Sequence, residues 1–436
     1  MSVANEGRRA YELALKLYPI YRSLTGFGVR KSLKIIGEYI GATSYKIYEV
    51  KTGTKAFDWT VPKEWKINDA YIESESGEKY ASFADNNLHI MGYSIPVDKW
   101  INRSELERYL YTQPDQEAAI PYVTSYYSER FGFCMSEKEK ACLKGDNFRV
   151  FVDSELYDGS LTYADCLIKG EADEEIVFST YCCHPQMGND NCSGMVLLAE
   201  LARYVKTLEK RHYSYRFALF PETIGAIVYL SQENRLEYMK KNTMGGYTLS
   251  CVGDDGDYSI IYSKSGNSLS DRALNNVLTF SESIGKEYKK YSYLERGSDE
   301  RQFNSPGVDI PVTGFCRTKY WEFPEYHTSL DTMDFISPEG LQGSIDVMKE
   351  VIDIIESNRN YRMTMPCEPQ LGKRGLYPSV SQKGKYDEVK AMMDFIGYAD
   401  GEKDLIQISE EINQPVKLLI PIVKKLIEEK IIIAED

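Results

Sequence analysis

The alternation of hydrophobic and polar residues predicts helices at the start of the chain and strands soon after. Residues 5–24 and 29–40 carry apolar side chains at helical spacing, with a glycine-rich break between them. From residue 45 to about residue 111 the pattern changes to short alternating runs separated by turn residues, which is typical of strands. We therefore expect an all-β domain over residues 45–111, inserted into a larger domain formed by residues 1–44 and 112–360.

Strand and helix patterns alternate through the rest of the larger domain. A helix is expected at residues 118–131 and strands over residues 148–169. The elements expected next are a strand at 175–181, a helix at 195–204, a strand at 213–220, and helices at 226–238 and 338–357. This alternation predicts the α/β class.

A different organisation follows residue 360. Residues 361–379 are punctuated by proline and glycine, which indicates a linker. Three amphipathic helices and a terminal strand are then expected at 386–396, 405–412, 416–429 and 431–434. This order is similar to a winged helix over residues 380–436. Residues 403–436 contain seven acidic and five basic residues, so the positive charge typical of DNA binding is absent there. We expect a packing module, or a contact with another protein or a second copy, and no nucleic acid partner.

Composition is that of a soluble enzyme with several domains. The chain has 436 residues, more than one hydrophobic core usually supports. Its net charge of −14 argues against nucleic acid or an anionic membrane as the main partner. Apolar runs of the length of a signal peptide or of a membrane helix are not found, and the nine cysteines lack a metal-finger spacing. We expect a cytoplasmic protein with reduced thiols.

One polar loop contains an imidazole and a carboxylate between an expected strand and an expected helix. The loop spans residues 182–194 and includes His184 and Asp190. Ligands of α/β sheets commonly bind at the carboxyl ends of strands, where this loop lies. Glu222 follows the end of a second expected strand, and His327 is another of the four histidines. Two imidazoles and two carboxylates are the groups that a hydrolytic zinc site requires, as ligands and as a proton acceptor.

Each of these residues also has an ordinary structural interpretation. Asp190 before a helix is typical of an N-cap, and taken alone we favour that interpretation. His184 before Pro185 is compatible with a histidine satisfied by the backbone at a strand end. Glu222 suits the first turn of a helix because of the helix dipole. Coincidence is a weaker explanation when these three residues and His327 are considered together, so the four residues jointly favour a metal site.

The order of the motifs resembles the zinc-dependent aminopeptidase and glutaminyl cyclase clan. The resemblance rests on His184, Asp190-Asn191-Cys192-Ser193-Gly194, Glu222-Thr223-Ile224-Gly225, Ser298-Asp299 before Gly307-Val308-Asp309-Ile310-Pro311, and Tyr326-His327-Thr328 before Asp331-Thr332. More narrowly, the chain looks like the bacterial aminopeptidase-like family with an inserted β domain and a carboxyl-terminal winged helix. The resemblance implies a mixed sheet flanked by helices, with residues 1–44 and 112–360 as a zinc peptidase-like catalytic domain.

Two departures from the clan's pattern bear on the number of metal ions. Thr223 stands where two-zinc members have a glutamate ligand, and Ser250 stands where they have an aspartate ligand. Asp254 and Asp255 replace Ser250 only if the strand register slips, which would reverse the face that a side chain occupies. We therefore favour one zinc per chain, with two as the alternative.

The resemblance implies a zinc-dependent hydrolase of peptide or related amide bonds. His184, Asp190 and His327 would bind the zinc, and Glu222 would accept the proton of the metal-bound water. Asp299 is expected to orient the substrate or contact its amine. Further candidates for substrate binding, because they lie near these motifs, are Arg296, Arg301, Arg317 and Tyr326.

Other functions fit parts of the pattern. A zinc-dependent acyltransferase or cyclase would use the same residues. A binding protein that has lost full metal chemistry is suggested by Thr223 and Ser250, and a peptide-sensing transcription regulator by the winged helix alone. A thiol nucleophile next to His184 carries little weight, because adjacent strand residues such as Cys182 and Cys183 point to opposite faces.

Overall fold

The computed structural model describes residues 5–280, 287–376 and 385–435, and the chain forms two compact units. The first unit takes in residues up to 265 together with 289–345, and the second takes in 266–288 and the residues from 346 onward. The three ligand candidates and Glu222 all belong to the first unit.

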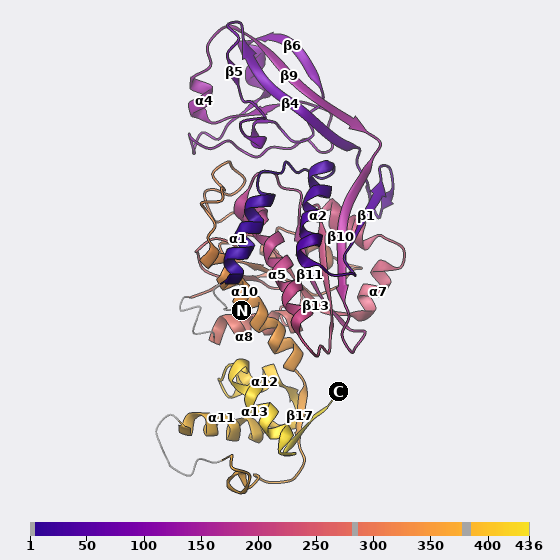
Figure 1. The fold of residues 1–436 in the computed structure, drawn as a ribbon, viewed down its shortest axis with the longest axis vertical. Coiled ribbons are helices and arrows are strands. Elements are labelled where there is room, and N and C mark those ends of the chain that lie inside the picture. The colour runs from indigo at the N-terminus through magenta and orange to yellow at the C-terminus, as the bar shows by residue number, and fades with distance from the viewer. Residues whose placement is uncertain (1–4, 281–286, 377–384, 436) are drawn as a thin grey trace. The chain divides into compact units, whose positions relative to one another are not determined.

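A mixed eight-stranded sheet forms the centre of the first unit (Figure 1). In spatial order its strands are β1 (Lys46–Lys51), β10 (Ser160–Ile168), β12 (Ser214–Phe220), β11 (Glu175–Tyr181), β13 (Thr243–Leu249), β16 (Val312–Cys316), β14 (Ser259–Ile261) and β15 (Lys289–Tyr291). The four strands from β12 to β16 in this order are parallel, while β1, β10 and β14 pair antiparallel to their neighbours towards the centre. The expected α/β class with a mixed sheet flanked by helices is confirmed.

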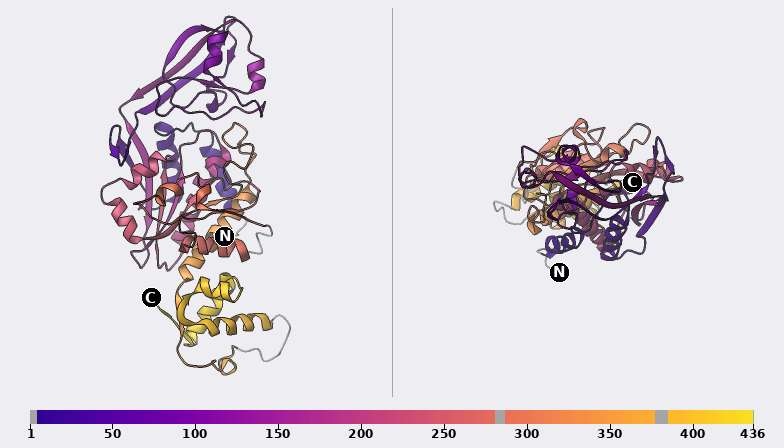
Figure 2. Two further views of the ribbon diagram at one scale, coloured as in Figure 1. Left: turned by 180° about the vertical axis from the view of Figure 1, so that it is seen from behind. Right: turned by 90° about the horizontal axis from the view of Figure 1, so that it is seen from above.

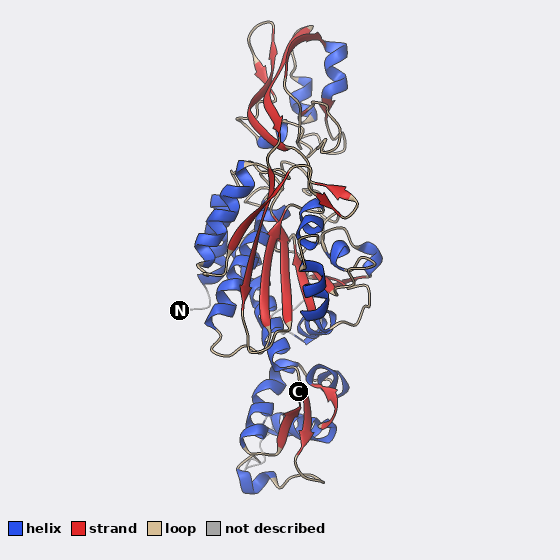
Figure 3. Ribbon diagram, turned by 90° about the vertical axis from the view of Figure 1, so that its right-hand side faces the viewer, coloured by secondary structure: helices blue, strands red, loops and turns tan. Residues whose placement is uncertain are grey.

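Helices cover both faces of this sheet (Figure 3). The helices of the unit are α1 (Glu6–Leu17), α2 (Phe27–Ile40), α3 (Arg103–Leu106), α4 (Glu137–Ala141), α5 (Gly194–Thr207), α6 (Ile224–Leu230), α7 (Arg235–Asn242), α9 (Glu300–Phe303) and the first part of α10 (Pro338–Ser357). α1 and α2 pack on α5, and α6 packs on β10 and β12. Every residue of β11 and β12 is buried, as expected for central parallel strands between helical layers.

A second, smaller sheet is built by three strands from the part of the chain that was expected to be all-β and by one later strand (Figure 1, and from behind in Figure 2). Its strands in order are β5 (Lys79–Tyr80), β4 (Glu64–Ser74), β9 (Asn147–Tyr157) and β6 (Val97–Asn102). Two short pairs lie outside it, namely β2 (Lys55–Ala56) with β3 (Trp59–Thr60), and β7 (Leu110–Tyr111) with β8 (Phe133–Cys134). β1 pairs in the large sheet although it begins at residue 46, and β9 completes the small sheet although it lies beyond residue 111. The boundaries 45–111 stay a prediction.

Two expected helices differ from the structure. Residues 118–131 form no helix: Pro121 bridges to Thr328, and the Tyr122 backbone N–H donates to the His327 carbonyl. Proline disfavours helical backbone at the residue before it and lacks an N–H, so apolar spacing was misleading there. The helix expected at 226–238 is divided into α6 and α7, with Asn234 in a left-handed conformation at φ 59° between them.

The second unit contains the expected winged helix. Its elements are α8 (Leu269–Phe280), the second part of α10, β17 (Asn360–Met363), α11 (Lys385–Tyr398), β18 (Asp400–Asp404), α12 (Leu405–Glu411), α13 (Val416–Glu428) and β19 (Ile432–Glu435). β17 is the central strand of a three-stranded sheet with β18 and β19, and three of its four residues lie in the segment expected to be a linker. Residues 377–379 of that linker, and residues 380–384 and 436 of the expected winged helix, lie outside the described residues.

The described residues include no helix that is both long enough and apolar enough to cross a membrane. The cytoplasmic location stays a prediction.

Candidate functional site

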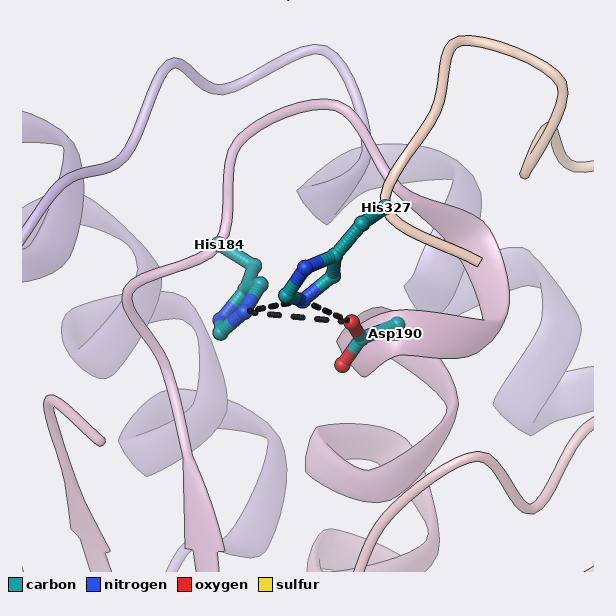
Figure 4. Close-up of side chains that lie close together, drawn as sticks. All are labelled: His184, Asp190 and His327. Atoms are coloured by element: carbon teal, nitrogen blue, oxygen red, sulfur yellow. Dashed lines mark hydrogen bonds and ion pairs between the residues drawn. The ribbon is translucent and has the colours of Figure 1, made fainter. Parts of the chain in front are cut away.

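His184, Asp190 and His327 converge at the carboxyl end of β11 (Figure 4). One ligand atom from each lies within 4.8 Å of the others. The two Nε2 atoms are 3.3 Å apart, and Asp190 Oδ2 lies 3.1 Å from His327 Nε2 and 3.8 Å from His184 Nε2. The structure therefore brings the three candidate ligands together, although His327 is 143 residues from His184.

Local backbone structure places each of the three. His184 lies three residues beyond β11, and Asp190 lies in η4 (Gly188–Ser193), a kinked helical turn that leads into α5. His327 has a left-handed conformation with φ 55°, and its carbonyl accepts the Tyr122 backbone N–H at 2.9 Å. The strand end and the two loops thus direct the three side chains to one point.

Burial makes this cluster electrostatically unusual. Burial lowers the pKa of His184 to about 4, although the Asp190 carboxylate opposes that shift, so the imidazole is neutral at pH 7. Burial alone would raise the pKa of Asp190, but the two imidazoles and the Tyr181 hydroxyl outweigh it and lower that pKa to about 2. Asp190 is fully buried, and although its Oδ2 lies at ion-pair distance from His327, no donor among the described residues meets it with hydrogen-bond geometry. A buried carboxylate oxygen without a hydrogen bond is costly unless a cation compensates it.

Glu222 faces the same place from the end of β12. Its Oε2 lies 3.8 Å from His184 Nε2, and its backbone N–H donates to Cys183 Sγ at 3.2 Å. Burial raises the pKa of Glu222 well above its usual range, and the carboxylates of Asp299 and Asp190 act in the same direction. Glu222 lines a cavity of about 270 Å³ together with both histidines.

Asp299 and Arg301 hold the turn that carries Glu222. Asp299 Oδ1 accepts the Thr223 backbone N–H at 2.8 Å, and Arg301 donates to the Thr223 hydroxyl. Thr223 needs this support because its φ of 63° is unfavourable for a β-branched residue. Burial raises the pKa of Asp299 to about 7, against the lowering effects of the Thr223 N–H and Arg301.

The other substrate-binding candidates are placed differently. Tyr326 stacks on His327 with ring centroids 3.9 Å apart. Arg296 is exposed and lies over the Tyr293 ring. Arg317 is buried and donates to the carbonyls of Gly256 and Gly340. Its guanidinium therefore serves the packing of those loops.

Asp254 and Asp255, the residues considered as replacement ligands for a second metal, do not join the cluster of His184, Asp190 and His327. Asp254 accepts hydrogen bonds from the Asn189 amide and the Thr318 hydroxyl. Asp255 accepts from the Ser337 hydroxyl, and Ser250 lies next to Cys316 Sγ. Within the described part of the chain, the only group of three or more such ligands is His184, Asp190 and His327.

Three residues of the site were missed by sequence reasoning. Asp331 accepts the backbone N–H groups of Asn189 and Asp190, Tyr181 donates to Asp190, and the Tyr122 ring contacts both histidines. Asp331 stands in the motif that follows His327, which was a usable signal. Tyr122 lies in the stretch that was expected to be helical, so no pattern placed it at the site.

Comparisons with known proteins agree with this architecture. A family model described as a domain of unknown function (DUF4910) matches residues 11–358, and a winged helix-turn-helix model matches residues 359–434. A Clostridium acetobutylicum protein, provisionally named a polysaccharide biosynthesis protein with an aminopeptidase-like domain, is 45% identical over 406 residues, which are 92% of this chain and 91% of that protein.

Solved structures show the same likeness. A crystal structure from Clostridium acetobutylicum, provisionally described as a peptidase, has a TM-score of 0.91 and 41% identity, covering 99% of this chain and 97% of that one. A zinc aminopeptidase from Bacillus subtilis has a TM-score of 0.56 and 15% identity, covering 79% and 94%, which shows a shared fold. The chain therefore belongs to the family described as a domain of unknown function (DUF4910), with an aminopeptidase-like fold followed by a winged helix-turn-helix.

Proposed function

We propose that this chain is a zinc-dependent hydrolase of peptide or related amide bonds. The observation that carries the proposal is the convergence of His184, Asp190 and His327 beside Glu222, with both histidines and Glu222 lining one cavity. The aminopeptidase-like fold supports it independently of these four residues.

The donor set fits zinc. Ligand bonds of about 2.0–2.2 Å in a tetrahedral site place neighbouring ligand atoms roughly 3.3–3.6 Å apart. The three separations of 3.1, 3.3 and 3.8 Å lie around that range. A neutral His184 and an ionised Asp190 are the forms that bind a metal, and Asp190 Oδ2 is a buried oxygen that accepts no hydrogen bond from the described residues. One zinc per chain is favoured, because the described residues offer one such group.

Each residue then has a separate role. Zinc held by His184, Asp190 and His327 would polarise the scissile carbonyl and increase the acidity of a water molecule. Glu222 accepts the proton of that water and passes it to the leaving amine. To do so Glu222 must be ionised, and a zinc ion bound to His184, whose Nε2 lies 3.8 Å from Glu222 Oε2, would lower the raised pKa of Glu222.

Asp299 and Arg301 act through Thr223. By holding its backbone N–H and its hydroxyl, they fix the turn that aims Glu222 into the cavity. We propose them as positioning residues. Tyr326 would orient His327 by stacking on its ring, and Arg296 and Arg317 have no role in this proposal.

A substrate panel tests the function. The intact protein is stripped of metal, reloaded with zinc, and incubated in heavy-oxygen water with aminoacyl amides, short peptides and N-acyl amino sugars. The sugars are included because the 45% identical relative is named for polysaccharide biosynthesis. Zinc-dependent products carrying one heavy oxygen, read by mass spectrometry, support a hydrolase, whereas products without it indicate an acyltransferase or cyclase.

Glu222→Gln sharpens the test. We expect the variant to keep its zinc and to lose roughly a hundredfold in turnover, as for loss of a positioned general base. Glu233→Gln, an exposed glutamate between α6 and α7, is the matched control. Loss of zinc from a folded Glu222→Gln protein would contradict the assigned role. Zinc binding without turnover of any substrate would favour a binding protein, for which Thr223 and Ser250 in place of carboxylates are the motivation.

The winged helix is proposed to contact protein, either a partner or a second copy, and not nucleic acid. Its acidic balance supports this proposal. A gel shift at low salt with genomic fragments tests it, and sequence-specific binding would contradict it.

A further inference from the structure

Four aromatic side chains line the cavity that contains Glu222. They are Trp59, Tyr122, Tyr126 and Tyr127, and we call them the aromatic wall. The cavity, at about 270 Å³, lies at the lower end of the roughly 300–1,000 Å³ typical of small-molecule pockets. It therefore has room for one large side chain beside the proposed reaction centre.

The inner part of the aromatic wall is held directly against the candidate ligands. The Tyr122 ring lies 5.3 Å from the His184 ring and 5.2 Å from the His327 ring. Its backbone N–H donates to the His327 carbonyl, and its hydroxyl bonds to the Tyr126 hydroxyl at 2.6 Å. These contacts give the wall a set position before any substrate arrives, which lowers the entropic cost of binding.

The outer part of the wall offers accessible aromatic surface. Trp59 belongs to β3, and Tyr127 follows Tyr126 on the loop that crosses to His327. Their rings meet edge to face at 5.6 Å, and Tyr127 is 62% exposed. Exposed rings that border a cavity gain by packing against an apolar ligand.

Charge decides which ligand suits the cavity. None of the described residues lining it is a lysine or an arginine, and Glu222 adds a carboxyl group. A substrate carboxylate would lose its hydration there without a cation to replace it. A sugar ring is favoured less than an apolar ring at the inner end of the wall, because the hydroxyls of Tyr122 and Tyr126 bond to each other and that of Thr223 accepts from Arg301.

We propose that the aromatic wall is a specificity pocket for a large side chain without negative charge, aromatic side chains above all, on the residue next to the scissile amide. Trp59 and Tyr127 are its specificity-determining residues. This inference rests on the proposed hydrolase function and adds the class of substrate to it. It places the choice of substrate on the β2–β3 pair and the loop at residues 121–127, away from the strand ends that carry His184 and Glu222.

The test compares amides of phenylalanine, leucine, alanine and aspartate with an N-acyl hexosamine, using the intact zinc-loaded protein. We expect kcat/KM for phenylalanine amide to exceed that for alanine amide by about tenfold or more. Trp59→Ala and Tyr127→Ala should each reduce this ratio by at least about threefold, and the control Trp100→Ala, an exposed tryptophan on β6, should not. Tyr127 is largely exposed, so its variant tests the pocket even if Trp59→Ala fails to fold.

Failure of the pocket and failure of the proposed function give different results. Turnover that favours alanine amide, aspartate amide or the sugar, or a ratio unchanged in Tyr127→Ala, would overturn the pocket and leave the hydrolase standing. If no amide is turned over, calorimetric titration with phenylalanine amide decides. Binding that weakens in Tyr127→Ala but not in Trp100→Ala supports the pocket alone, and absent or unchanged binding overturns it.

Discussion

The Asp331 carboxylate holds Asp190 through the backbone: its Oδ2 accepts the Asp190 N–H at 2.8 Å, while its Oδ1 accepts the neighbouring Asn189 N–H at 2.6 Å. Asp331 is fully buried, and burial raises its pKa to about 8 against the lowering effect of the Asn189 N–H. The residue that follows the His327 motif thus fixes the loop that carries the Asp190 carboxylate.

Replacing Asp331 should weaken metal binding without removing a ligand. We expect Asp331→Asn to lower zinc affinity by roughly 10–100-fold, the usual effect of losing a group that orients a ligand. Competition with a zinc-binding dye measures it. Asp334→Asn, an exposed neighbour, is the control. Equal affinity in Asp331→Asn and Asp334→Asn would show that the loop keeps its shape without this carboxylate.

The metal count should be close to one zinc per chain. Thr223 and Ser250 have no carboxylate, and Asp254 is engaged by Asn189 and Thr318. Elemental analysis by mass spectrometry, without excess metal, should give about one zinc in the wild type and in Asp254→Asn plus Asp255→Asn. Two tightly held ions that fall to one in the double variant would mean that these aspartates bind metal.

The stability of the first unit should depend on the ionisation of Glu64. Burial opposes ionisation, but hydrogen bonds from Arg30, Tyr157 and the Ser160 N–H outweigh it and lower the pKa of Glu64. Because this pKa lies below the unfolded value of about 4.3, the stabilisation is present above that pH and is lost as the pH falls through the folded pKa.

Thermal unfolding from pH 7 to pH 3 tests this dependence. Glu64→Gln should unfold at a lower temperature than the wild type at pH 7, and the gap should narrow below about pH 4. Glu49→Gln also removes a partner of Arg30, but Glu49 is half exposed, so its effect should be smaller. A gap for Glu64→Gln that does not change with pH would show that packing, not charge, is the cause.

Thiol reactivity should separate the exposed cysteines from those near the site. Burial raises the pKa of Cys182 to about 12 and that of Cys183 well above its usual range, so neither forms a thiolate at neutral pH. Of the nine cysteines only Cys142 and Cys367 are exposed. A thiol reagent should therefore label two cysteines in the native protein. Rapid labelling of Cys183 would contradict this expectation and support the alternative in which a thiol acts as the nucleophile.

Regular elements with a strong local signal were predictable from the sequence. The strand at 175–181 and the helix at 338–357 have the predicted bounds, because the strand is a short run rich in β-branched and aromatic residues and a long amphipathic helix repeats its pattern. Residues 118–131 show where this reasoning fails. Several of their apolar side chains are buried from a non-helical backbone of turns and isolated bridges, and spacing alone does not distinguish that from a helix face.

The sequence by itself determined the residue types of the candidate site, since His184, Asp190, Glu222 and His327 stand in recognisable motifs, the first three of them after expected strands. Only the tertiary structure decided which groups meet. Asp331 and Tyr122 reach the cluster through backbone hydrogen bonds between distant loops, and such bonds leave no periodic pattern. Arg317, which lies equally close to a motif, donates to Gly256 and Gly340 instead. Sequence order shows where a strand ends, whereas side-chain direction and burial depend on contacts between segments that the fold brings together.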